Sequence, residues 1–286
     1  MNELYEKIQE TLSKLRHDEI TDKEFYEISD INCFENYMDT YSNNNIINIL
    51  AGTISSALPV NSSLFEFYLS KGLEPNLVDN SKGKTPIFSC SYSYEIVQTL
   101  VKYGANLNHQ DDGGNTFLMY GTNFRVFKYA VDNGYQLLTK NSNGKDILYS
   151  LFDNRYNHGD EPLKEQIKIL EYMLISKYFN VNEYNYNQLS ILQFAMTYGD
   201  LPLEALELLV KYGASPNLET ITETSFRLWS EERTILSKGT QTLDIIKKQK
   251  ETLEFEHKQG LISEDYYYQK GINYYDKATD ILKSNK

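Results

Sequence analysis

The side chains that most often carry chemistry in proteins are few in this 286-residue sequence, and they lie far apart. No two histidines have the spacing of a metal pair on a helix, and neither cysteine has a histidine nearby in sequence: His17, His109, His158, His257, Cys33 and Cys90. Two adjacent carboxylate pairs fit solvated surface better than general acid–base chemistry, Asp111–Asp112 and Glu231–Glu232. The sequence has no glycine-rich phosphate loop and no nucleophile elbow. We therefore predict no enzyme activity, no catalytic residue, no metal site, no cofactor and no small-molecule substrate.

The elements that would position functional residues repeat along the chain. An apolar helix tail that ends in glycine is followed by asparagine, most clearly in residues 100–108 and 209–217. Successive tails are spaced by 32, 30, about 44 and about 35 residues, at Gly72, Gly104, Gly134, Tyr178 or Phe179, and Gly213. About ten residues after a tail comes a residue able to start a helix: Thr85, Thr116, Asp146 or Ser190. This period suggests one structural repeat that occurs about five times.

Each recurring letter has a local physical role. A hydroxyl or carboxylate ahead of an apolar run can accept hydrogen bonds from the first backbone amides of a helix, so these four residues are predicted N-caps. Pro86 suits the first helical position, where no intrahelical hydrogen bond is lost. A glycine after the last turn suits a left-handed C-cap. We therefore expect each repeat to contain two helices, of which the second ends at the glycine.

The second helix of each unit has apolar pairs at i, i+1, i+4 and i+5, as in residues 96–101, 126–131 and 205–210. This spacing gives an apolar stripe that is too wide for a lone helix in water. Helix pairs stacked side by side would bury it.

Together with the start Thr85-Pro86-Ile87-Phe88, the period near 33 residues resembles the ankyrin repeat over about residues 46–226. The resemblance implies an all-α, ankyrin-like helical repeat solenoid of about five helix pairs. Every copy lacks the histidine of the family's Thr-Pro-Leu-His motif, which normally ties neighbouring loops together. We therefore expect hydrogen bonding between repeats to differ or to be weaker.

The segments outside the repeats also have helical patterns. We predict an N-terminal helical cap in residues 1–45, where Thr21 and Glu24 form a capping box, and a C-terminal helical pair in residues 227–286. Both pairs would cover the apolar flank of a terminal repeat. The polar stretch 153–162 is predicted to be a loop, either a contact loop or a tolerated insertion.

The net charge of −12 is concentrated at the front, where residues 1–39 hold 11 acidic and 4 basic residues. This balance argues against direct nucleic-acid binding and favours a basic partner, although a negative surface also simply keeps a protein dispersed. The two distant cysteines indicate no disulfide framework, and no apolar run fits a signal peptide or a membrane span. We expect a soluble cytoplasmic protein.

The resemblance implies that the chain binds another protein through its loop tips and first helices. Tyrosine, present 24 times, adds rings with a large contact area to such a face. The predicted contact residues are Ser81, Lys82, Tyr92, His109, Gln110, Asp112, Tyr120, Ser142, Asn143, Tyr149, Tyr186 and Asn187.

The predicted function is a non-enzymatic protein-binding module that sequesters, inhibits or scaffolds its partner. An immunity or inhibitor protein directed against a toxin is the first choice, drawn from the class of stand-alone ankyrin proteins. One alternative is an acidic nucleic-acid mimic that blocks a nuclease or DNA-binding protein. A second alternative is a host-directed ankyrin effector.

Overall fold

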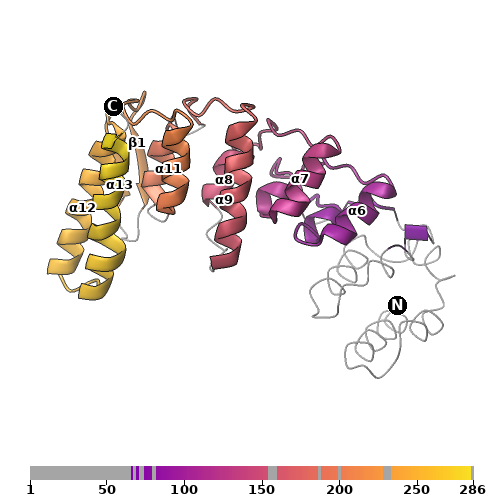
Figure 1. Ribbon diagram of the computed structural model, residues 1–286, viewed down its shortest axis with the longest axis horizontal. Coiled ribbons are helices and arrows are strands. Elements are labelled where there is room, and N and C mark those ends of the chain that lie inside the picture. The colour runs from indigo at the N-terminus through magenta and orange to yellow at the C-terminus, as the bar shows by residue number, and fades with distance from the viewer. Residues whose placement is uncertain are drawn as a thin grey trace, which may run out of the picture. The chain divides into compact units, whose positions relative to one another are not determined.

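The computed structural model describes residues 66, 69–70, 74–78, 82–153, 160–185, 188–198, 201–227 and 233–284 (Figure 1). The chain divides into two units, Met1–Ser142 and Asn143–Lys286. We call them unit 1 and unit 2. The predicted N-terminal cap and the tail at Gly72 lie outside the described residues.

The described part of unit 1 contains two consecutive layers, each made of a short helical turn and a longer helix. The first layer is η1 (Pro86–Ser89) with α6 (Tyr94–Lys102), and the second is η2 (Phe117–Tyr120) with α7 (Phe124–Asp132). The turns pack against each other, and so do the two helices. The predicted apolar stripes are buried, because Ile96, Val97, Val126 and Phe127 have no exposed surface.

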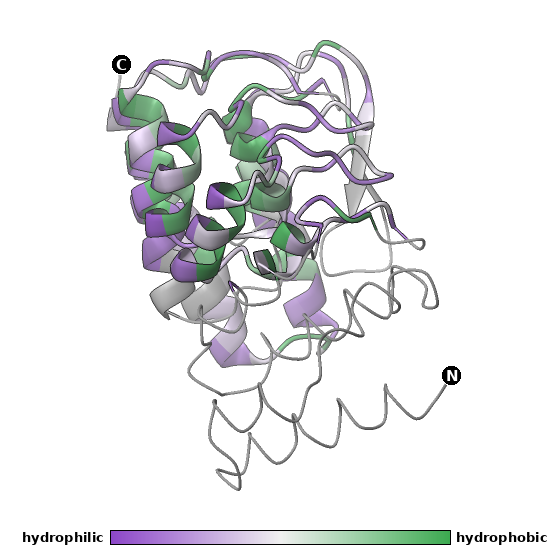
Figure 2. Ribbon diagram, turned by 90° about the vertical axis from the view of Figure 1, so that its right-hand side faces the viewer, coloured by the Kyte–Doolittle hydropathy of each residue, from purple (hydrophilic) through white to green (hydrophobic). Residues whose placement is uncertain are grey.

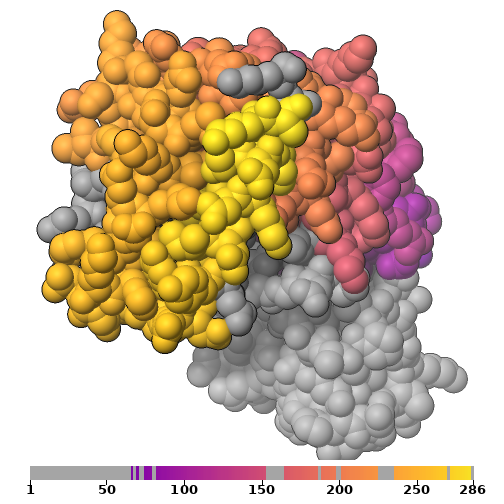
Figure 3. Space-filling view, turned by 60° about the vertical axis from the view of Figure 1, so that its left-hand side comes forward, coloured from indigo at the N-terminus to yellow at the C-terminus, as the bar shows by residue number. Residues whose placement is uncertain are grey.

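Among its described residues, unit 2 has three helix pairs that stack in two rows. The pairs are α8 (Ile147–Asp153) with α9 (Asp160–Ile175), α10 (Ile191–Tyr198) with α11 (Leu203–Lys211), and α12 (Thr242–Lys258) with α13 (Asn273–Ser284). In one row α8 packs on α10 and α10 on α12, and in the other α9 packs on α11 and α11 on α13. In Figure 3, α13 is the yellow helix beside α12. The C-terminal pair therefore forms the next layer of the array, and its capping role stays a prediction.

The glycine tails take the predicted conformation. Gly104, Gly134 and Gly213 have φ of 91°, 96° and 94°. In each case the glycine amide donates to the carbonyl three residues back, and the following amide donates to the carbonyl five residues before it. This is the Schellman arrangement, which satisfies the last carbonyls of a helix. In the degenerate copy the left-handed residue is Lys177, with φ of 55°, rather than the predicted Tyr178 or Phe179.

The predicted N-caps form in unit 2 but not in unit 1. In unit 2, Asp146 accepts a hydrogen bond from the Tyr149 amide, and Ser190 accepts one from the Gln193 amide. In unit 1 the prediction is wrong, because the hydroxyls of Thr85 and Thr116 make no capping hydrogen bond. These two residues precede single 3₁₀ turns, which close through backbone bonds to their carbonyls.

The predicted loop 153–162 is shorter than its polar composition suggested. Helix α8 ends at Asp153 and α9 begins at Asp160, so residues 160–162 form the first turn of α9. Proline is tolerated there because the first amides of a helix have no intrahelical partner. Helix α9 has 16 residues, whereas α6, α7 and α11 have 9 each, which accounts for part of the long spacing between tails.

The helical expectation for residues after 226 is wrong at one place. Strands β1 (Thr224–Arg227) and β2 (Arg233–Leu236) form an antiparallel hairpin in which Thr224 pairs with Leu236. β-Branched residues favour this extended pairing. Apart from this hairpin, the regular elements of the described residues are helical, so the all-α class is confirmed. Figure 2 shows apolar residues gathered on the helices and hydrophilic residues along the loops.

Candidate partner-binding face

Asparagine side chains join successive layers at the turns that follow the second helices. Asn76 donates from Nδ2 to the Gly104 carbonyl at 2.9 Å and accepts from the Asn106 amide at 2.7 Å. Asn108 makes the same pair of bonds to the Gly134 carbonyl and the Gln136 amide. Each asparagine therefore fixes the turn of the next layer through both ends of its carboxamide.

The same connection is present in unit 2. Asn182 donates to the Gly213 carbonyl at 2.9 Å and accepts from the Ser215 amide at 2.8 Å. In the third copy Leu138 stands four residues after the glycine, where Asn76 and Asn108 stand in theirs, and its side chain is 59% exposed.

The loop tip of unit 1 is organised around Asp111. Its carboxylate accepts hydrogen bonds from the amides of Gly113 and Asn115 and from the hydroxyl of Tyr120. The side chain is 7% exposed, so the expectation that Asp111 is solvated surface is wrong. Its neighbour Asp112 is exposed, as expected. A buried carboxylate that accepts several donors is a structural element of the turn.

Tyr120 is held in place from several directions while much of its ring faces solvent. Its hydroxyl donates to Asp111, the Lys84 ammonium lies 3.6 Å from its ring centroid, and the Phe88 ring packs against it edge-on at 5.9 Å. The ring remains 43% exposed. Burial first, and then the neighbouring Asp111, which favours the protonated form, together raise the pKa of the Tyr120 hydroxyl to about 12.

Neighbouring side chains strengthen the same region of unit 1. His109 makes a 2.7 Å hydrogen bond with the Gly83 carbonyl, and its ring meets Phe88 edge-on. Gln110 donates to the Gly114 carbonyl in its own loop and to the Lys140 carbonyl, and the second bond joins this loop to the next one. The loop tip is therefore fixed before any partner arrives.

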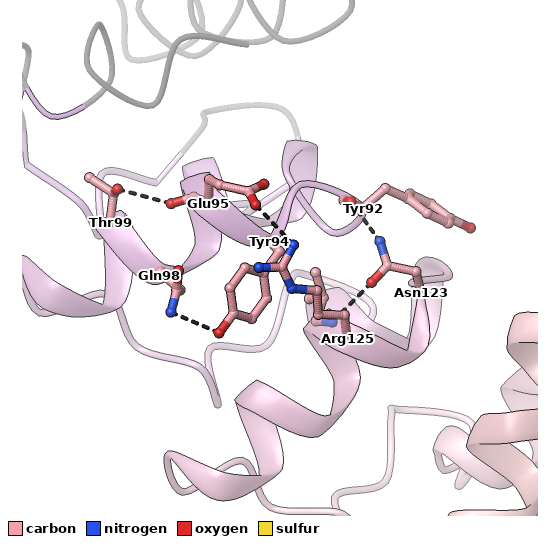
Figure 4. Close-up of polar contacts among 8 residues, drawn as sticks. Tyr92, Tyr94, Glu95, Gln98, Thr99, Asn123 and Arg125 are labelled. Carbon is pink, nitrogen blue, oxygen red and sulfur yellow. Dashed lines mark hydrogen bonds and ion pairs between the residues drawn. The ribbon is translucent and has the colours of Figure 1, made fainter. Parts of the chain in front are cut away.

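Tyr92 is the second exposed ring of this unit, at 49% exposure. Its backbone carbonyl accepts a 2.7 Å hydrogen bond from Asn123, which also caps α7. In Figure 4 the Tyr92 ring points away from a separate cluster in which Arg125 lies over the ring of Tyr94 and pairs with Glu95.

Besides the asparagine link, unit 2 has a second kind of connection between layers. It is made by the residue that stands where the ankyrin motif has histidine. The Tyr149 hydroxyl donates to the Glu183 carbonyl at 3.1 Å. Gln193 donates to the carbonyls of Leu218 and Thr240 and accepts from the Ser190 amide. Hydrogen bonding between repeats therefore differs from the family pattern, as expected.

The structure places the predicted contact residues in different situations. Exposed in unit 1 are Lys82, Tyr92, Gln110, Asp112, Tyr120 and Ser142, and His109 is half-buried. In unit 2, Asn143 is exposed, but Tyr149 is only 6% exposed and acts as an internal link between layers. Ser81, Tyr186 and Asn187 lie outside the described residues.

Chemically reactive groups do not assemble in the part of the chain that the structure describes. No three histidine, cysteine or acidic side chains there are close enough to hold a metal ion. The thiol of Cys90 is buried and donates to the Pro86 carbonyl, and burial raises its pKa, so it remains protonated and unreactive. Among the described helices, none is long and apolar enough to span a membrane.

Comparison with known proteins agrees with the layered fold. Residues 55–141 match the model of the family described as ankyrin repeats, in three copies. A solved structure that matches is the crystal structure of EF0377, an ankyrin repeat protein, with a TM-score of 0.53 and 14% sequence identity, covering 86% of this chain and 100% of that chain. A search of curated proteins found no match. Residues 55–141 are therefore similar to ankyrin repeats, and the fold of the chain is similar to that of a solved ankyrin repeat protein. Ankyrin repeats generally bind proteins.

Sequence reasoning missed several residues that organise the face of unit 1. Lys84, Phe88 and Asp111 hold Tyr120, yet none was predicted to belong to a contact site. The asparagine links had a visible signal, because Asn76 and Asn108 each stand four residues after a tail glycine, and Asn182 stands four residues after Tyr178 of the degenerate tail. No comparable spacing pointed to Lys84.

Proposed function

We propose that unit 1 binds a partner protein through a loop-side face. This face consists of Lys82, Lys84, Tyr92, His109, Gln110, Asp112, Tyr120 and Ser142. The position of Tyr120 carries the proposal, because its hydroxyl, its ring face and its ring edge are each engaged by the protein while the ring stays 43% exposed. A rigid exposed aromatic ring is typical of the residues that dominate protein interfaces.

Preorganisation supports this use of the face. An interface that orders loops on binding loses part of its interaction energy to that ordering. Here Asp111, His109 and Gln110 already fix the loop tips through hydrogen bonds to neighbouring backbone. Binding of a partner therefore costs little conformational entropy in these loops.

The biological role that fits a module of this kind is to sequester, inhibit or scaffold its partner. We propose an inhibitor or immunity protein that masks a toxin, with a host-directed effector as the alternative. The support is the class of protein together with a face suited to contact rather than to chemistry.

The experiment begins with affinity capture from native cytosol and identification of the bound protein by mass spectrometry. The purified partner is then titrated by calorimetry against the wild type and the double variant Tyr92→Ala/Tyr120→Ala. Removing two exposed rings is expected to weaken binding by about tenfold or more. Tyr178→Ala is the matched control, because this tyrosine is 59% exposed and lies in unit 2.

Circular dichroism of each variant separates a lost contact from a lost fold. Equal affinity of the wild type and the double variant would remove the loop-side face from the proposal. The nucleic-acid mimic makes the opposite prediction, because its acidic residues precede the described part of the chain: Glu3, Glu6, Glu10 and Asp18. If reversing those four charges abolished capture while the tyrosine variant bound normally, the mimic would replace the present proposal.

A further inference from the structure

The sequence contains two Asn–Gly dipeptides, Asn133–Gly134 and Asn143–Gly144. In this dipeptide the backbone nitrogen of the glycine can attack the side-chain carbonyl carbon of the asparagine, since glycine has no Cβ to shield that nitrogen. Both asparagines are exposed, so solvent access does not distinguish them. Their local structures do.

Asn133 is held in the C-terminal cap of α7. Its Nδ2 donates to the Tyr129 carbonyl at 2.8 Å, and its backbone amide also bonds to the end of the helix. The Gly134 amide donates to the Val131 carbonyl at 3.2 Å. Both reacting groups are therefore tied, and the attack requires the last turn of the helix to open.

Asn143 and Gly144 lie in the turn that precedes α8, whose first residue is Ile147. Gly144 has φ of 75°, and neither residue belongs to a helix. Rotation of the Asn143 side chain toward the Gly144 nitrogen therefore does not require a helix to unwind. Loop tips are also the places where local opening costs least.

We propose that Asn143 is a site of spontaneous deamidation. The Gly144 nitrogen forms a bond to Cγ of Asn143, the Cγ–Nδ2 bond breaks, and the backbone proton leaves with the side-chain nitrogen as ammonia. The product is a cyclic succinimide. Solvent water then opens one of its two carbonyl–nitrogen bonds and leaves either aspartate or isoaspartate. The step needs no oxidant, reductant or enzyme.

The product changes a residue that was predicted to contact a partner. Either form adds a negative charge to the turn before α8, and isoaspartate also lengthens the backbone of that turn by one atom. An effect on partner affinity rests on a contact at Asn143, which the sequence predicts and which lies outside the loop-side face. The chemical step itself does not depend on any partner.

The test follows the purified full-length protein during prolonged incubation in neutral buffer. Trypsin places the two sites in separate peptides, residues 129–140 and 141–145, and fragment-ion mass spectra locate each conversion of amide to acid. We expect Asn143 to react about tenfold faster than Asn133, because attack at Asn133 requires the last turn of α7 to open, whereas Asn143 lies in a turn. The variant Asn143→Gln should remove the reaction from peptide 141–145.

A parallel incubation in concentrated urea provides the reference. Without the folded cap both dipeptides should react at similar rates, so the difference between the sites should disappear. The proposal would be overturned if Asn133 reacted as fast as Asn143 in the folded protein. It would also be overturned if peptide 141–145 kept its amide in the folded protein while reacting in urea.

Discussion

The two units build their first segments differently although they share one repeat pattern. In unit 1 these segments are the four-residue turns η1 and η2, which have no side-chain cap, and their third residues are Phe88 and Met119. In unit 2 they are the capped helices α8 and α10, and their third residues are Tyr149 and Gln193. Phenylalanine and methionine side chains cannot donate a conventional hydrogen bond to the next layer, whereas tyrosine and glutamine do so here.

This difference shows that the repeat period fixes which elements stack but not how they are joined. Unit 2 joins its layers partly through buried side chains near the helix starts. Unit 1 joins its layers through the asparagines of its turns, through Gln110, and through Thr122, whose hydroxyl donates to the Ser91 carbonyl. Its Tyr120 stays at the surface. The contact face and the internal links thus use equivalent parts of the repeat for different purposes.

The largest expected effect comes from removing a buried link in unit 2. Gln193→Leu leaves the Leu218 carbonyl and the Ser190 amide without this partner and removes one of the two donors to the Thr240 carbonyl, in a site where Gln193 has no exposed surface. We expect a loss of about 2–4 kcal/mol in the free energy of unfolding, measured by urea denaturation. The equivalent change in unit 1 is Met119→Leu, which removes no hydrogen-bonding group and should cost less than about 1.5 kcal/mol. Similar losses for both variants would contradict the proposed difference between the units.

A smaller effect is expected at the left-handed residue that ends the second helices. Gly104→Ala meets no atom within 4 Å of the added carbon, so the expected loss of about 1 kcal/mol comes from the backbone conformation alone. The reverse change in unit 2, Lys177→Gly, should stabilise the protein by up to about 1 kcal/mol, because Lys177 already has φ of 55°. Thermal denaturation of both variants tests the pair. Shifts of the same sign would show that backbone strain does not decide stability at these positions.

The smallest effect concerns the pH dependence of unit 1. The pKa of Tyr120 is raised to about 12 in the folded protein, above its ordinary value of 10. Its hydroxyl therefore contributes stability that is fully present below pH 10 and is lost as the pH rises toward 12. Tyr120→Phe should cost about 1 kcal/mol at neutral pH. Denaturation at several pH values should show the gap between the wild type and the variant closing above pH 10, and a constant gap would contradict this linkage.

Much of the fold could be predicted because its signals are local. The glycine tails, the apolar stripes and the caps at Asp146 and Ser190 follow from backbone geometry and helix periodicity. The sequence also contained a signal for the 3₁₀ turns of unit 1. Helix α6 begins nine residues after Thr85 and α7 eight after Thr116, whereas α11 begins 13 residues after Ser190. The shorter intervals leave too little chain for an α-helix and a turn.

The candidate site was harder to predict because its residues meet through the fold. Lys84 reaches Tyr120 from 36 positions away, and Asp111 looks like a solvated loop residue until its three donors are in place. The hairpin β1–β2 was missed for a related reason. Each of its strands has only four residues, and these include polar residues as well as apolar ones. Such short strands give a weak sequence signal compared with the long helical patterns that follow.

The two rows of unit 2 have a consequence for how such a chain can change over evolutionary time. The pair α12–α13 is seated on α10–α11 as that pair is seated on α8–α9. An in-frame duplication or deletion of one whole period would therefore present each remaining helix with the same kind of neighbour. Lineages can lengthen or shorten the array without inventing a new core, provided that the last pair stays last.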